Sequence, residues 1–334
     1  MAFPTDWLYR KSITLSRASG AVTNYQMKLK VGESSGAAGE NVDCGGLCKT
    51  DFSDLRFTAS DGTTLLDYWI ESVSGTTPNQ LATVWIEFNS IGTGATTFYM
   101  YYGNAGASAV SDGDTTFPFF EHFLADPPDA ADWYHWLNNG SSSVSGSIFA
   151  TTGHASYNAW GCKQKFGTNY AYRGRVKVSS EATGGDMNVF GFDDRSDDGT
   201  AVGAGADNAK ISFSNGSQYY DNNREGTQTR AARTDGITAY TIAEIQRNAS
   251  TDVRFLINDT LKVTSTTNVP TDTCGFIQWS NSATPTISWD WVLVRQFLVT
   301  EPAWGSWGGQ EDLSGGGTVM NNQFFVMLLA GGGR

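Results

Sequence analysis

The 334-residue sequence has no cluster of basic residues. It contains 22 Lys and Arg against 34 Asp and Glu, which gives a formal net charge of −12. Nucleic acids and anionic membranes attract proteins mainly through Lys and Arg side chains that pair with phosphate groups. We therefore expect no nucleic-acid partner.

Segments for export or for crossing a membrane are also missing. Residues 1–7 lack the basic and apolar regions and the cleavage site of a signal peptide. The longest apolar run, residues 324–330, is far shorter than the roughly 20 residues that span a bilayer. We expect a chain with no signal peptide and no membrane span.

Only four cysteines and three histidines are present. Cys44 and Cys48 flank a Gly-Gly-Leu loop, whereas Cys162 and Cys274 lie far apart in the sequence. A structural zinc site takes four Cys or His ligands at short spacings, and no second pair accompanies the loop. The loop pair suits a small disulfide in an oxidising setting, and the other two cysteines are expected to be buried apolar residues.

Short segments of alternating apolar and polar residues fill most of the chain, and amphipathic helical periodicity is essentially absent. Period-two alternation predicts strands with one buried face. Ser60 to Thr63 contains an Asp-Gly pair between two such segments and predicts a tight hairpin turn. The strand segments are residues 12–15, 26–31, 55–57, 65–71, 83–88, 97–102, 170–178, 187–192, 210–213, 239–246, 253–257, 261–264, 275–279 and 287–294. The sequence therefore predicts an all-β protein.

The length exceeds what one hydrophobic core usually organises. Residues 103–114 are rich in Gly, Ala, Ser and Asp, which is typical of a boundary between domains. We predict two tandem β-sandwich domains at residues 1–114 and 115–311, followed by a Gly-rich tail with an apolar segment at 312–334.

Two parts of the chain resemble known families. The first carries Trp-Leu-Tyr-Arg-Lys at 7–11, Asp-Phe-Ser-Asp-Leu-Arg-Phe-Thr at 51–58, Leu-Asp-Tyr-Trp-Ile-Glu at 66–71 and Tyr-Met-Tyr-Tyr-Gly-Asn at 99–104. These motifs resemble domain of unknown function 2341, a family of bacterial, archaeal and viral surface proteins that has no established catalytic residues.

The second part resembles the concanavalin A-like lectin and glucanase superfamily. The resemblance rests on Phe-Glu-His-Phe at 120–123, the strand pair around residues 240–242 and 253–259, and Trp-Asp-Trp-Val-Leu-Val-Arg at 289–295. It implies a jelly roll. Because this superfamily includes glycan binders, structural modules and glycosidases, the fold alone does not choose among them.

Catalytic motifs are not evident. Related hydrolases place two carboxylates on one strand as Glu-x-Asp-x-x-Glu, and this run does not occur here. Glu244 has no acidic neighbour on its strand, and Asp290 is expected to pair with a nearby Arg such as Arg295. No Gly-x-Ser-x-Gly elbow is present either. We therefore expect a protein without enzymatic activity.

One acidic loop has part of a calcium-binding pattern. Asp194, Ser196 and Asp198 alternate before Gly199, as ligands one, three and five of a calcium loop do, but position twelve is Gly205. Calcium is the candidate cofactor here, and a solvated acidic turn is the alternative.

Glycan binding needs aromatic rings for the faces of sugars and amide or carboxylate groups for hydroxyls. Trp136 lies in a turn-rich segment, and Tyr219 and Tyr220 precede Asn222 in a predicted loop. These four residues are the candidate glycan site. The alternative for each aromatic is a place in the core, because sandwich cores also contain aromatics.

Flexible glycines surround the apolar segment near the end of the chain. An exposed apolar segment is a liability in a monomer, so we expect it to dock on another subunit, with packing on its own domain as the alternative. Its docking residues would be Phe324, Phe325, Met327, Leu328 and Leu329. We expect a homo-oligomeric structural and adhesive protein of a virion, such as a tail, fibre or capsid-decoration component, that meets host glycans. A secreted or cell-surface carbohydrate-binding module is the alternative, and a glycoside hydrolase is third.

Overall fold

The structure, a computed structural model, describes residues 6–18, 20–126, 128–137, 140–153, 158–179, 187–195, 207–214, 217–280 and 286–314. Within these ranges nearly all regular structure is β-strand, and the one helix, α1 (Gly113–Thr116), is a single turn. The predicted all-β class is confirmed. No helix in the described ranges has the length and apolar character needed to cross a bilayer.

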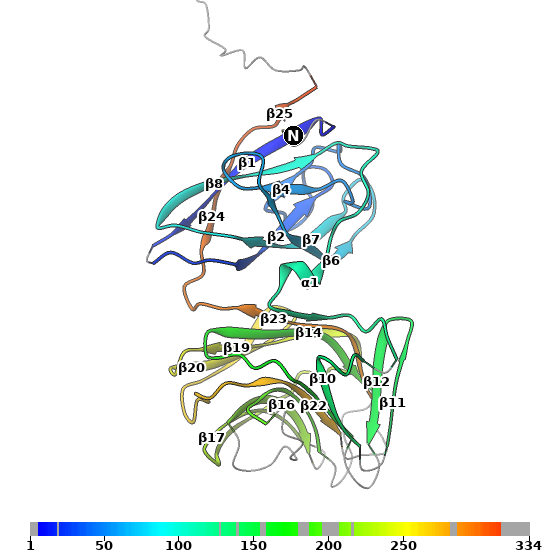
Figure 1. The fold of residues 1–334 in the computed structure, drawn as a ribbon, viewed down its shortest axis with the longest axis vertical. Coiled ribbons are helices and arrows are strands. Elements are labelled where there is room, and N and C mark those ends of the chain that lie inside the picture. Colours follow the sequence, from blue (N-terminus) through cyan, green and yellow to red (C-terminus); the bar gives the residue numbers. More distant parts are fainter. Residues whose placement is uncertain are drawn as a thin grey trace, which may run out of the picture.

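The first domain is a sandwich of two sheets (Figure 1). One sheet has the order β24-β1-β8-β4-β5, with β25 also paired to β1, and the other has the order β3-β2-β7-β6. Its strands are β1 (Tyr9–Arg17), β2 (Tyr25–Gly32), β3 (Val42–Asp43), β4 (Arg56–Thr58), β5 (Leu65–Leu66), β6 (Tyr68–Ser74), β7 (Leu81–Phe88), β8 (Gly94–Tyr102), β24 (Ala303–Trp307) and β25 (Glu311–Asp312).

The hairpin predicted at Ser60 to Thr63 joins β4 to β5. Gly62 has a φ of +69°, a value that glycine adopts without the steric cost of a Cβ. The Asp61 carboxylate accepts hydrogen bonds from the backbone N–H groups of Thr63 and Thr64, both at 2.9 Å. The turn chemistry read from the sequence is therefore confirmed.

The end of the described chain returns to the first domain. β24 pairs with β1 through Ile13 and Leu15, and β25 continues the same edge, with Arg10 opposite Glu311. The predicted domain boundaries include residues 303–311 in the second domain, whereas β24 joins a sheet of the first. The sequence of an edge strand of five residues does not indicate which sheet it will join.

The second domain is a larger sandwich. Its sheets have the orders β10-β13-β22-β15-β16-β17-β18 and β11-β12-β23-β14-β19-β20-β21, with β9 also paired to β23. The strands of the seven-stranded sheet are β10 (Trp133–Leu137), β13 (Asn158–Cys162), β15 (Met187–Asp193), β16 (Asn208–Ser214), β17 (Ser217–Arg224), β18 (Thr227–Ala232) and β22 (Gly275–Ser280). Those of the eight-stranded sheet are β9 (Phe119–Glu121), β11 (Gly140–Ser145), β12 (Ile148–Gly153), β14 (Tyr170–Val178), β19 (Thr241–Asn248), β20 (Asp252–Ile257), β21 (Thr260–Ser265) and β23 (Thr286–Gln296).

Aromatic side chains fill the space between these two sheets. The Phe190 and Trp289 rings meet edge to face at 4.9 Å, and the Tyr172 and Phe276 rings stack at 4.9 Å. Each pair joins one sheet to the other, and all four side chains are almost fully buried. Truncating one of these rings to alanine would cost about 3–5 kcal/mol.

A separate aromatic cluster joins the two domains. Trp69 and Trp85 of the first domain lie with Phe117, Phe120 and Trp291 against the outer face of the eight-stranded sheet. The Trp69 ring contacts Phe120 at 4.8 Å and Trp291 at 5.1 Å. The first domain therefore covers this face, and the seven-stranded sheet lies on the far side of the molecule (Figure 1).

Candidate functional site

The outer face of the seven-stranded sheet is the side turned away from the eight-stranded sheet. Strand register aligns one row of residues across it, in the order Trp136, Ala159, Trp279, Val189, Ser212 and Tyr219. The neighbouring positions Phe190, Ile211 and Tyr220 belong to the core. Because successive strand residues face opposite sides, the aligned row points away from the core between the sheets. Only Trp136 and Tyr219 at its two ends are partly exposed, and the four residues between them are buried.

Aromatic rings occupy both ends of this row. On β10, Tyr134 and Trp136 stack with their ring centroids 5.6 Å apart, and Tyr134 is 39% exposed. On β17, the half-buried Tyr219 ring lies 4.2 Å beneath the Arg230 guanidinium. Aromatic rings thus lie at the two ends of a row that five strand pairings connect.

A second row, two residues along the strands, carries charge. It aligns Lys210, Asp221 and Arg230 on β16, β17 and β18. The Asp221 carboxylate accepts a hydrogen bond from the Ser212 hydroxyl and another, at 2.7 Å, from Arg230 Nε. Lys210 is buried, and burial lowers the pKa of its ammonium although Asp193 and Asp221 favour the charged form.

A third row carries carboxylate and amide groups. Register aligns Asp193, Asn208 and Asn223, and all three are buried. Asp193 Oδ1 accepts the Arg195 backbone N–H at 3.0 Å, but Asp193 Oδ2 and Asn223 Oδ1 have no hydrogen-bond partner among the described residues. Burial raises the pKa of Asp193 to about 6, although the positive charge of Lys210 acts to lower it.

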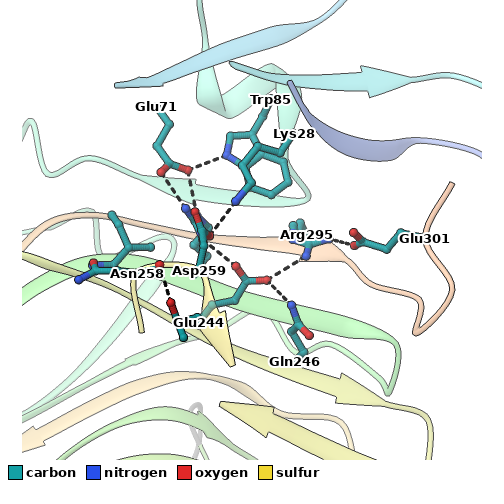
Figure 2. Close-up of polar contacts among 12 residues, drawn as sticks. Lys28, Glu71, Trp85, Glu244, Gln246, Asn258, Asp259, Arg295 and Glu301 are labelled. Atoms are coloured by element: carbon teal, nitrogen blue, oxygen red, sulfur yellow. Dashed lines mark hydrogen bonds and ion pairs between the residues drawn. The ribbon is translucent and has the colours of Figure 1, made fainter. Parts of the chain in front are cut away.

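The outer face of the eight-stranded sheet carries a different set of charges, which Figure 2 shows. Arg173 on β14 is the centre of this network and is fully buried. It donates to Glu71 of the first domain from Nε at 2.9 Å and from Nη2 at 2.8 Å. The same guanidinium donates through Nη1 to Glu244 and to Asp259, each at 2.7 Å.

Other cations complete this network. Arg295 donates to Glu244 at 2.8 Å and to Glu301 at 2.6 Å, and Lys28 pairs with Asp259 at 2.7 Å. Burial alone would raise the pKa of Glu244, but Arg295 and Arg173 hold it at about 2. Every carboxylate named here faces a cation, so the network serves to fix one domain on the other.

The structure separates the four predicted glycan residues. Trp136 and Tyr219 lie on the outer face, but Tyr220 is in the core and donates from its hydroxyl to Asp235 at 2.8 Å. Asn222 is buried and donates to the backbone carbonyls of Thr267 and Asn268. Tyr220 and Asn222 line a cavity of about 230 Å³ between β17, β18 and β21. They form no continuous surface with Trp136 and Tyr219.

Several other predicted residues lie outside the described ranges. These are Ser196 and Asp198 of the calcium loop, and Phe324, Phe325, Met327, Leu328 and Leu329 of the tail. Asp194 is described, with its carboxylate 3.9 Å from Arg195 Nε. The described residues contain no group of three or more His, Cys, Asp or Glu placed to hold a metal ion.

Sequence reasoning missed the charged rows. Asp290 does pair with a nearby arginine, but the partner is Arg175 on the adjacent strand. Arg295, the example that the sequence suggests, pairs with Glu244 instead. Asp193, Lys210, Asp221 and Arg230 were not singled out. Alternation along residues 208–213 does place Lys210 on the side turned away from the core. Asp221 lies beside it through the register of the next strand, which alternation alone does not give.

Comparisons with known proteins found one family model and several solved structures. Residues 51–136 match a family model described as domain of unknown function DUF2341, which confirms the resemblance for that part of the chain. A sequence search of curated proteins found no match.

Solved structures match over about half of the chain. A prokaryotic β-1,3-1,4-glucanase (lichenase) from a mouse hindgut metagenome is 14% identical over 54% of this chain and 99% of its own, with a TM-score of 0.42. A Bacillus licheniformis β-glucanase is 15% identical over 53% and 97%, with the same score. An endo-acting O-glycanase from human gut microbiota is 12% identical over 54% and 99%, also at 0.42.

The names of these three structures are those of two glucanases and an O-glycanase. The expectation of a protein without enzymatic activity is therefore not upheld. The expectation rested on the missing Glu-x-Asp-x-x-Glu run, and the absence of one motif does not exclude catalysis by carboxylates on other strands. At this identity the likeness extends to the fold and to no particular substrate.

Proposed function

We propose that this chain is a carbohydrate-active protein that binds a glycan on the outer face of its seven-stranded sheet. The observation that carries the proposal is the alignment of three rows on one face: aromatic rings, an ion-paired row and a row of carboxylate and amide groups.

The three rows offer the two kinds of contact that a sugar makes, stacking on its ring faces and hydrogen bonds to its hydroxyls. Aromatic rings such as Tyr134, Trp136 and Tyr219 stack on the apolar faces of pyranose rings. Carboxylate, amide and guanidinium groups form hydrogen bonds with hydroxyls, and Arg230 is 36% exposed at its side chain. The outer face of the eight-stranded sheet is a poorer candidate for binding a sugar. The first domain covers it, and its cations and carboxylates are paired with one another.

Binding and cleavage can be tested in the same samples. The intact protein would be screened against a glycan array and a panel of soluble polysaccharides, with release of reducing ends measured in parallel. We expect binding to at least one glycan, with the affinity reduced about fivefold by Trp136→Ala or Tyr219→Ala, because loss of a stacking ring costs about 1 kcal/mol.

A matched control comes from the other sheet. Tyr240 is an aromatic residue stacked under Arg175 on the outer face of the eight-stranded sheet, with the two groups 4.3 Å apart. Tyr240→Ala should leave glycan binding unchanged, and Trp136→Phe should retain most of it. Equal loss in the Tyr240 and Trp136 variants, at unchanged melting temperature, would place the glycan elsewhere.

We propose that this glycan-binding protein is displayed on the surface of a virion or a cell. In support, β25 lies at the end of the first domain remote from the seven-stranded sheet (Figure 1). Attachment through the residues that follow β25 would leave the glycan-binding face free. Deleting residues 319–334 should yield a folded protein that no longer assembles, and assembly with unchanged stoichiometry would contradict this role for the tail.

A further inference from the structure

The loop between Cys44 and Cys48 brings two thiols together. Its backbone turns tightly because Gly45 and Gly46 both have positive φ values, +60° and +77°, which residues with a Cβ rarely adopt. The Leu47 N–H donates to the Cys44 carbonyl at 3.1 Å and closes the turn. The Cys44 and Cys48 thiols hydrogen-bond to one another.

The two thiols differ in access. Cys44 is fully buried in the core of the first domain, and Cys48 is half-buried at the edge of that core, with its Sγ 3.9 Å from the Glu33 carbonyl. Burial raises the pKa of the Cys44 thiol well above its ordinary value. Cys48 is therefore the thiol that meets a dissolved oxidant first.

We propose that Cys44 and Cys48 form a reversible disulfide, a modification site in a loop that lies against the segment between β24 and β25. The loop lies against this segment, since a Cβ at Gly45 would be 3.6 Å from the Gln310 side chain. Gln310 in turn accepts a hydrogen bond from the Tyr102 hydroxyl at 3.0 Å. The site belongs to the first domain and is independent of the glycan-binding face.

The reaction is a thiol–disulfide exchange with a small disulfide as the oxidant, for which oxidised glutathione is the probe. The Cys48 thiolate attacks one glutathione sulfur, forms a mixed disulfide and expels a glutathione thiolate. The Cys44 thiolate then attacks the Cys48 sulfur and expels the second glutathione. The protein loses two protons and two electrons, and the oxidised glutathione becomes two thiols.

The other two cysteines provide an internal control. Cys162 and Cys274 are fully buried, and their Sγ atoms point to different backbone carbonyls, those of Gln164 and Asp207. Oxidation should therefore lower the number of titratable thiols in the denatured protein from four to two. Peptide mapping by mass spectrometry should identify the link as Cys44 to Cys48.

Two variants test the order of the steps. Cys44→Ser should accumulate the mixed disulfide of Cys48 with glutathione, and Cys48→Ser should keep its three remaining thiols under the same conditions. Oxidised wild type should melt a few degrees higher than reduced protein, because the link restricts the unfolded chain. Four thiols after oxidation, a link to Cys162 or Cys274, or a mixed disulfide that persists at Cys48 in the wild type would each overturn the proposal.

Discussion

The two outer faces of the second domain differ in how their buried carboxyl groups are paired. On the eight-stranded sheet, Glu244 lies between two arginines, and its pKa is about 2. On the seven-stranded sheet, Asp193 is equally buried, one of its oxygens has no hydrogen-bond partner among the described residues, and its pKa is about 6. Burial is similar in the two places, so the difference lies in the pairing.

This difference in pairing distinguishes a network that holds the domains together from a face that is a candidate for binding. A buried ion network with every member paired holds elements in place, whereas buried polar groups left without partners cost free energy and collect at sites that serve another purpose. The paired network joins the domains, and the incompletely paired face is where we expect a ligand to supply the missing contacts.

The largest expected effect comes from breaking the paired network. Arg173→Met removes the shared partner of Glu71 and Glu244 and leaves both carboxylates buried. We expect the free energy of unfolding to fall by about 3–5 kcal/mol in chemical denaturation. Arg175→Met, two residues along the same strand, breaks a largely solvated pair with Asp290 and should cost less than about 1 kcal/mol. Equal losses in the two variants would contradict the importance of the network.

Acid should weaken the same network. The folded pKa of Glu244 lies below its ordinary value of 4.5, so its contribution to stability is complete above about pH 4.5 and is lost as the pH falls through about 2. The shift corresponds to about 3 kcal/mol. Denaturation of the wild type between pH 5 and pH 2 should show this loss, with a smaller pH dependence in Glu244→Gln. An identical slope in that variant would assign the acid sensitivity to other groups.

The face with incomplete pairing should respond to pH in the opposite direction. The folded pKa of Asp193 lies above its ordinary value of 3.8, so its contribution is present below about pH 4 and is lost as the pH rises through about 6. Lys210, Asp194 and Arg195 are the charged groups near it. Asp193→Asn should therefore gain about 2 kcal/mol relative to wild type between pH 4 and pH 7.5. A constant difference across this range would show that Asp193 does not titrate there.

The smallest effect concerns binding. Lys210→Met keeps the length of the side chain but removes its charge from between Asp193 and Asp221. If the charged row contacts glycan hydroxyls, affinity should fall a fewfold by calorimetry, less than for Trp136→Ala. Glycan affinity that is insensitive to both changes would move the site away from this face.

The sequence predicted the fold better than the site. Alternation and turn residues such as Asp61 and Gly62 act locally, and they identified the strands and the hairpin. The site depends on which strands become neighbours, and residues 303–307, which pair with β1 near the start of the chain, show that pairing can depend on distant segments. Tyr220 and Tyr219 illustrate the limit, because adjacent aromatics in one strand point to opposite faces, and the sequence did not show which one faces the core.

The measurement that tests the central comparison most directly is an NMR titration of the carboxyl carbons of Asp193 and Glu244 in the folded protein. We predict that Asp193 titrates near pH 6 and that Glu244 stays ionised down to about pH 2. A titration of Asp193 below pH 4 would show that its carboxylate is fully paired, and the distinction between the two faces would then be wrong.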